Sequence, residues 1–294
     1  MDRPARFEQK PRPAGPPTIS FRWLVTAFAS TLLFAGLCWY GALCLLFWQG
    51  QWQLLFHPSH AMTATPASSG IPYQETHFAS SLTGEPTLDG WAIPAAPGSK
   101  YGTATVLYLH DARGSLSDCV PDLATLHSTG INVFAVDYRG FGRSADLHPT
   151  ERTVTEDAAS AWAYLTDERG IPPGRILVFG DGAGATLAAH LAFRFAPAGV
   201  VLEDSNLSAR QILLSDSRAR LLPLWLIQNE KLDPSADLAA GHIPRLFLDV
   251  RGNSARSRQL FDLSSYPKQY FDLRAAPGSA FTAALGRFFD DVLP

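Results

Sequence analysis

A long segment without charged side chains, from Trp23 to Trp48, restricts what the first part of this chain can fold into. At about 1.5 Å of rise per residue, a helix over this segment exceeds the roughly 30 Å hydrocarbon core of a bilayer. Trp23 and Trp48 bracket it, as aromatic residues at membrane interfaces do. The alternatives are a buried core helix or a signal peptide, which has a shorter apolar region and a small-residue cleavage site. We predict a tail over residues 1–20, a transmembrane helix over 21–48 and a domain over 49–294.

The charges on the two sides of this helix predict its orientation. Basic residues dominate before it, against only Asp2 and Glu8; they are Arg3, Arg6, Lys10, Arg12 and Arg22. Residues 49–72 contain no Lys or Arg. Because basic flanks stay on the cytoplasmic side, we expect a cytoplasmic N-terminus and a domain outside. For a bacterial inner-membrane protein, that side is the periplasm.

Composition argues against several classes of function. The net charge is −3 at pH 7, without the basic excess of a nucleic-acid-binding protein. Three cysteines are too few for a disulfide framework, and their positions suggest no metal site. We therefore predict no nucleic acid, metal or cofactor. The membrane is one expected partner, through residues 21–48, and a membrane protein of unknown identity is another.

Beyond residue 50, short β-like runs alternate with helical ones, a pattern typical of a largely parallel sheet covered by helices. The predicted buried strands are 103–110, 131–137, 175–180, 199–204 and 244–250. The predicted helices are 115–129, 153–169 and 184–196. The runs "YQETHFAS" and "TLDGWAIPA" predict an antiparallel pair at the start of the sheet. One α/β domain follows, with helices on both faces of its sheet.

Several motifs in this order resemble the α/β-hydrolase superfamily, and most closely its membrane-anchored Bem46-like group. They are "QWQLLFHP", "LYLHDARGSLSD", "DYRGFGRS", "PPGRILVFG", "GVVLEDS" and "LLPLWLIQNEKLD". The resemblance runs from about Gln53 to the C-terminus and implies an α/β-hydrolase-like fold. Within "DYRGFGRS", we expect Arg139 and Arg143 to hold their loop in place. The resemblance also implies serine-hydrolase chemistry, with a nucleophilic Ser, an acid and a His in that chain order.

The nucleophile of such enzymes lies at the centre of a G-x-S-x-G turn, called the nucleophile elbow. In this chain the turn reads Gly180, Asp181, Gly182, Ala183, Gly184. Gly182 takes the place of the Ser and has no side chain that could attack a substrate. It also relieves the backbone strain that the turn imposes on its central residue, a cost of about 1–3 kcal/mol.

The base, the acid and the oxyanion loop of the family are altered as well. No His occurs in residues 243–294, and the family's "PGxGH" turn corresponds to "PGSAF", which places Phe281 near the former His position. The loop 251–259 contains no Asp or Glu, and Asp249 lies too early, within the predicted strand. In the former oxyanion loop, Asp111 follows His110, and its carboxylate would oppose a developing oxyanion.

Other residues near this turn offer further hypotheses. His110, Asp111 and Asp181 would be a possible metal-ligand set, but we expect His110 to hydrogen-bond within its own loop. We expect His190 to pack among the alanines and leucines of its helix. We predict no catalytic residue and expect an inactive binding, scaffolding or accessory subunit of a membrane complex. The alternative is a membrane-bound esterase or lipase-like enzyme with a non-standard active site.

Overall fold

The computed structural model describes residues 20–80, 84–205, 209–215, 217, 219–251, 254–274 and 278–293. The chain divides into two compact units, Met1–Phe47 and Trp48–Pro294. Helix α1 (Phe21–Gly50) extends two residues beyond the predicted range and is long and apolar enough to cross a membrane. A membrane span and a signal sequence both have this length and composition. Apart from Ser20, the predicted tail lies outside the described residues.

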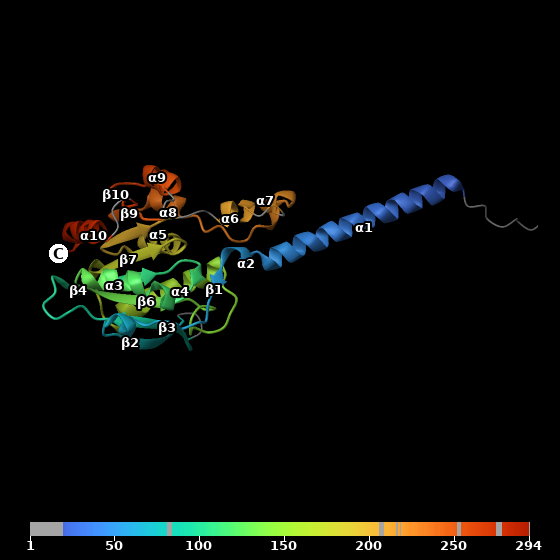
Figure 1. Cartoon of the computed structure of the whole chain (residues 1–294). Coiled ribbons are helices and arrows are strands. Elements are labelled where there is room, and N and C mark those ends of the chain that lie inside the picture. The colour runs from blue at the N-terminus through green and yellow to red at the C-terminus, as the bar shows by residue number, and fades with distance from the viewer. Residues whose placement is uncertain are drawn as a thin grey trace, which may run out of the picture. The chain divides into compact units, whose positions relative to one another are not determined.

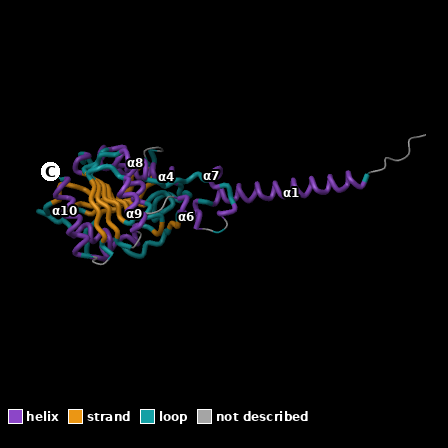
Figure 2. The backbone as a smooth tube through the Cα atoms, turned by 90° about the horizontal axis from the view of Figure 1, so that it is seen from above, coloured by secondary structure: helices purple, strands orange, loops and turns teal. Residues whose placement is uncertain are grey.

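The second unit is built on an eight-stranded sheet in the order β10-β9-β8-β7-β4-β6-β3-β2 (Figures 1 and 2). Its strands are β2 (Gln74–Ala79), β3 (Pro86–Ile93), β4 (Tyr101–Leu109), β6 (Ile131–Asp137), β7 (Ile176–Asp181), β8 (Gly199–Glu203), β9 (Arg245–Asp249) and β10 (Lys268–Asp272). Strand β3 runs in the opposite direction to the other strands of this sheet. The predicted strands and the antiparallel pair are confirmed, whereas β10 was not predicted.

Helices cover both faces of this sheet (Figure 2). They are α3 (Val120–Ser128), α4 (Glu151–Ala163), α5 (Gly184–Phe195), α8 (Ser235–Ala240), α9 (Ser254–Leu263) and α10 (Ser279–Val292). Short elements complete the unit: α2 (Trp52–Leu55), β1 (His57–Pro58), η1 (Pro66–Ser69), β5 (Arg113–Gly114), η2 (Leu116–Cys119), η3 (Tyr164–Glu168), η4 (Pro173–Arg175), α6 (Ala209–Ser215), η5 (Ala219–Leu221) and α7 (Leu224–Ile227).

The alternation of side chains along the strands explains the two layers. On one face, Tyr108 and Phe179 join a buried cluster with Leu123 of α3 and Phe288 of α10. The opposite face packs against α5, which contacts β7 and β8, and against α9, which contacts β9. The central strands are buried on both faces, which is why they read as continuous apolar runs in the sequence.

Two predicted helices have different limits in the structure. The helix predicted at 153–169 begins two residues earlier, because Thr150 caps it: the Thr150 hydroxyl accepts a hydrogen bond from the Thr153 amide at 3.2 Å. It continues as the π-helical turn η3. The helix predicted at 115–129 consists of the 3₁₀ turn η2 followed by α3, with Ser115 and Asp118 forming a capping box.

Candidate functional site

The elbow connects β7 to α5 and retains the backbone that a nucleophile would require. Gly182 has a φ of +57°, in the left-handed region that L side chains rarely adopt. A side chain on Gly184 would come within 2.1 Å of the Leu109 carbonyl oxygen, so helix and strand approach closely there. The positive φ confirms that a glycine relieves backbone strain at the centre of this turn.

The carboxylate of Asp111 lies directly over this turn. Its Oδ1 accepts a hydrogen bond from the Ala183 amide at 2.7 Å. A Cβ added to Gly182 would lie 2.4 Å from the same oxygen and 2.5 Å from Asp111 Cγ. Asp111 therefore fills the space in which a nucleophilic side chain would begin. It also neutralises part of the positive end of the α5 dipole.

His110 is fully buried, and its hydrogen bond stays within its own loop, as predicted. Its Nδ1 donates to the Asp111 carbonyl at 2.7 Å, and its ring packs on Tyr138, with the ring centroids 4.4 Å apart. Burial lowers the pKa of His110 to about 4, so the ring is neutral at pH 7. His110 Nε2 lies 3.5 Å from Asp137 Oδ1. These contacts hold the loop in place.

A cluster of three carboxylates lies beside the elbow, where β7, β8 and β9 end. The carboxylate oxygens of Asp181, Glu203 and Asp204 lie within 4.8 Å of one another. Arg251 contacts all three: its Nε donates to Asp204 Oδ2 at 2.7 Å, and its Nη2 donates to Asp181 and lies 4.0 Å from Glu203. We call these four residues the Arg251 cluster.

The Arg251 cluster carries more negative than positive charge. Burial raises the pKa of Asp181 to about 7 despite the nearby Arg251, and burial raises that of Glu203 well above its usual range. Among the described residues, these carboxylates form the one group with metal-ligand spacing. The guanidinium that donates to two of them supplies the charge that a cation would bring, so the residues do not fit a metal. The hypothetical set of His110, Asp111 and Asp181 is not brought together.

The two remaining triad positions hold residues with structural contacts. Phe281 lies in the first turn of α10 and packs toward Phe179 of β7, with 6.5 Å between ring centroids. Asp249 is the last residue of β9, as expected, and is fully buried. Its Oδ2 accepts a hydrogen bond from the Tyr270 hydroxyl at 3.0 Å, and burial raises its pKa.

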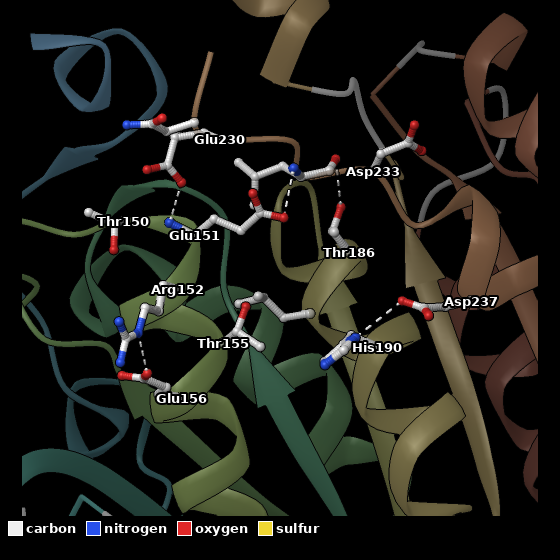
Figure 3. A pocket seen from close by; sticks show the side chains of 13 residues that line it. Thr150, Glu151, Arg152, Thr155, Glu156, Thr186, His190, Glu230, Asp233 and Asp237 are labelled. Atoms are coloured by element: carbon white, nitrogen blue, oxygen red, sulfur yellow. Dashed lines mark hydrogen bonds and ion pairs between the residues drawn. The ribbon is translucent and has the colours of Figure 1, made fainter. Parts of the chain in front are cut away.

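A cavity of about 540 Å³ lies beside α5 rather than over the elbow (Figure 3). Its described lining comes from α4, α5, α8 and the segment 229–233, and it includes none of the five elbow residues. Glu151 fixes this segment by accepting hydrogen bonds from the Lys231 and Leu232 amides, and Glu230 accepts one from the Glu151 amide. Most of the charged side chains that line the cavity are carboxylates.

His190 faces this cavity, which corrects the prediction that it packs among apolar residues. Its side chain is 39% exposed, and its Nδ1 lies 3.3 Å from Asp237 Oδ2 (Figure 3). The prediction failed because α5 presents this position to α8, and not to the sheet. The pair combines an imidazole with a carboxylate that orients it.

Sequence reasoning missed Arg251 and its role. The signal was present, since the carboxyl ends of parallel strands meet at one edge of a sheet. Asp181 directly follows one predicted strand, Glu203 and Asp204 end another, and Arg251 directly follows a third. An arginine at the same edge as three carboxylates predicts an ion pair.

Comparisons with known proteins agree with this architecture. Residues 114–230 match a protein family described as having the alpha/beta hydrolase fold. The uncharacterized protein Rv2307c of Mycobacterium tuberculosis is 28% identical over 230 residues, which cover 77% of this chain and 79% of that protein. Alpha/beta hydrolase domain-containing protein 17C of Xenopus tropicalis is 29% identical over 127 residues, 43% of this chain and 40% of that protein.

Solved structures share the same fold at low sequence identity. The Pyrococcus furiosus esterase Pf2001 superposes with a TM-score of 0.63 at 18% identity, over 81% of this chain and 100% of that chain. At this identity the likeness concerns the fold, and the chemistry depends on the site itself.

Proposed function

We propose that this chain, which has the α/β-hydrolase fold, acts as a membrane-anchored binding, scaffolding or accessory subunit and not as a hydrolase. The proposal includes its assignment to the Bem46-like group, which rests on the ordered motifs and on the apolar helix α1. It also includes the orientation predicted from the flanking charges, with the N-terminus in the cytoplasm and the second unit in the periplasm.

The contact between Asp111 and the elbow carries this proposal. In hydrolases of this fold, the amide after the nucleophile stabilises the negative oxygen of the tetrahedral intermediate. Here the corresponding Ala183 amide donates to the Asp111 carboxylate. A substrate oxygen would have to displace a group that already carries negative charge. The same carboxylate fills the space next to Gly182.

The other triad positions support the same conclusion. The segment in which the family places its acid begins with Arg251, whose guanidinium is committed to Asp181 and Asp204. Phe281 packs against the core, and its side chain has no group that could accept a proton. A neighbouring residue can take over from a single lost one. Here the family positions of the nucleophile, the base and the acid all hold other residues, and the oxyanion amide is already bonded to Asp111.

The alternative is an esterase or lipase-like enzyme with a displaced catalytic set. One observation favours it: the His190–Asp237 pair faces a cavity of about 540 Å³, and an imidazole oriented by a carboxylate is a general base. Thr186 also lines this cavity, but its hydroxyl donates to the Leu232 carbonyl at 3.4 Å. The alternative therefore has a base without an evident activated nucleophile.

Ester hydrolysis by the purified full-length chain tests the proposal. We expect no turnover of a short-chain p-nitrophenyl ester and no labelling by a fluorophosphonate, either for the native chain or for Gly182→Ser. The double variant Gly182→Ser/Asp111→Gly should also remain inactive, because no base faces the introduced Ser. Turnover by either Gly182 variant would contradict the proposal. Turnover by the native chain that is lost in His190→Ala, but not in the control His127→Ala, would establish the alternative.

A pull-down of the tagged full-length chain from its native membranes in mild detergent tests the scaffolding part. We expect a membrane protein to co-purify in a near-stoichiometric amount, since the rigid outer unit and the apolar helix each offer a contact surface. Purification of the chain alone would argue against a role as a subunit. Small residues in α1, among them Ala35, Gly36 and Ala42, permit close approach of another helix.

A further inference from the structure

Three large apolar side chains form an exposed patch on η5 and α7. The exposed fractions are 76% for Leu221, 80% for Trp225 and 68% for Leu226. Residues 221–228 contain no charged side chain. Grouped apolar side chains on a protein surface mark an interaction site, whereas single ones are ordinary. We call these three residues the α7 patch.

Hydrogen bonds fix the α7 patch next to the first residues of the second unit. The buried Gln51 side chain donates from Nε2 to the Ile227 carbonyl at 3.4 Å and accepts from the Asn229 amide at 3.2 Å. It also donates to the Trp48 carbonyl at 3.0 Å. Figure 1 shows α7 and α2 at the same end of this unit. The patch is therefore held beside the residues that directly follow the apolar helix.

A fourth exposed apolar residue lies near the same end of the second unit. The ring of His148 stacks on that of Trp52 with 4.4 Å between centroids, which holds the loop before α4 against α2. Leu147, the preceding residue, is 49% exposed. Two separate segments thus bring exposed apolar side chains to the start of the second unit.

We propose that the α7 patch contacts the lipid bilayer that α1 spans. The proposal rests on the membrane anchor of the proposed function. With Trp48 at the interface, Gln51 follows it by three residues, about 4.5 Å of helical rise. Interfacial apolar groups enter the boundary of headgroups and acyl chains by about 5–10 Å. Covalent connection to the anchor therefore brings the patch within reach of the bilayer surface.

The chemistry of the patch fits lipid as its partner. Trp is enriched at the level of the headgroups because its ring is apolar and its N–H is polar. Leu221 and Leu226 flank it with side chains that are stable among acyl chains.

Fluorescent labels on the full-length chain in phosphatidylcholine nanodiscs test this contact. An environment-sensitive dye is attached at Leu226→Cys or Leu221→Cys, in a background in which Cys38 and Cys44 are Ser. Each preparation is measured with brominated acyl chains, which quench within the bilayer, and with iodide, which quenches from water. We expect both labels to shift to shorter wavelength, lose intensity with brominated lipid and resist iodide.

Two further labels separate the possible outcomes. Phe193→Cys, at a site that is 52% exposed near the end of α5, is expected to respond to iodide alone. Leu33→Cys in α1 reports the anchor and should respond to brominated lipid.

If the Leu33 label responds to lipid while the labels at 221 and 226 behave like the one at 193, the patch proposal is overturned and the anchor stands. A Leu33 label that does not respond to lipid overturns both. Labels at 221 and 226 that resist iodide but ignore brominated lipid would identify a protein occupant, which also overturns lipid contact.

Discussion

Two arginines follow parallel strands at the same edge of the sheet, yet they differ in burial and in their partners. Arg139, in the loop after β6, is buried and donates to Asp157 from its backbone amide at 2.8 Å and from its Nε at 2.6 Å. Arg251, after β9, has a side chain that is 56% exposed and contacts three buried carboxylates. We call the first region the β6 loop and the second the β7–β9 edge.

The difference lies in the balance of charge. In the β6 loop the Arg139 guanidinium donates to the fully buried Asp157 at 2.6 Å and to Glu156 at 3.3 Å, and the loop is held in place as expected for Arg139. Glu156 also pairs with Arg152, so two guanidinium groups meet two carboxylates. Arg143 of the same loop reaches Glu75 at 2.8 Å, so both predicted roles are confirmed. At the β7–β9 edge negative charge is in excess, and the pKa of Asp181 rises to about 7 as a result of burial. Burial also raises the pKa of Asp157, to about 6, so this carboxylate is mostly ionised at pH 7, whereas Asp181 titrates at neutral pH.

The largest effect is expected when the pair of Arg139 and Asp157 is broken. Asp157→Ala leaves Arg139 buried without its main partner, which should cost about 3–5 kcal/mol in the free energy of unfolding. Thermal and urea denaturation of the full-length chain, followed by circular dichroism, measure it. The control Asp167→Ala removes an exposed carboxylate of η3 and should change little. Equal effects of the two substitutions would show that the buried pair has no special role.

Filling the elbow should have the next largest effect. Gly182→Ala imposes a φ of +57° on an L residue and displaces Asp111 from the Ala183 amide, for a total of about 2–4 kcal/mol. The control Gly174→Ala has open space around the added methyl group. Combining Gly182→Ala with Asp111→Ala should give a coupling of about 0.5–3 kcal/mol. Strictly additive effects would show that the two residues do not compete for this space.

Removing the cation from the β7–β9 edge should have a smaller effect that depends on pH. Arg251→Gln should cost about 1–3 kcal/mol near pH 8, reduced because water already reaches the guanidinium. The loss should shrink toward pH 5, where the carboxylates of Asp181 and Glu203 are protonated. The control Arg152→Gln removes a guanidinium that is 83% exposed. A loss that does not vary with pH would contradict the charge imbalance.

Per pH unit, the smallest effect concerns Asp137, the last residue of β6. Burial raises its pKa to about 7, so the folded state holds a proton that the unfolded state releases near pH 4. Stability from this group is present at low pH and is lost as pH rises from about 4 to 7. Asp137→Asn does not titrate and should gain stability relative to the native chain over this window, by at most about 1.4 kcal/mol per pH unit. The exposed Asp146→Asn serves as control, and a difference that stays flat would refute the buried titration.

Most of the fold could be predicted from local patterns, because the central strands are apolar on both faces and the helices have periodic apolar positions. Strand β10 escaped because its residues are partly exposed and only its pairing with β9 defines it. At the site, the glycine at position 182 was enough to predict the loss of the nucleophile. The position of the Asp111 carboxylate and the meeting of Arg251 with Asp181 depend on contacts across about seventy residues of sequence, which no local pattern contains.

The hydrogen bond between Asp111 and the Ala183 amide has a consequence for ligand competition. A carboxylate held by the chain acts as a tethered ligand, with an effective concentration of the order of millimolar or more. A free carboxylate or phosphate that approaches the start of α5 must displace the Asp111 carboxylate. It binds there only if its affinity for the amide is high enough to outcompete the effective concentration of this tethered group. The turn that most resembles a hydrolase elbow is therefore already occupied by the protein's own anion, and selective anion binding would have to take place elsewhere on the molecule.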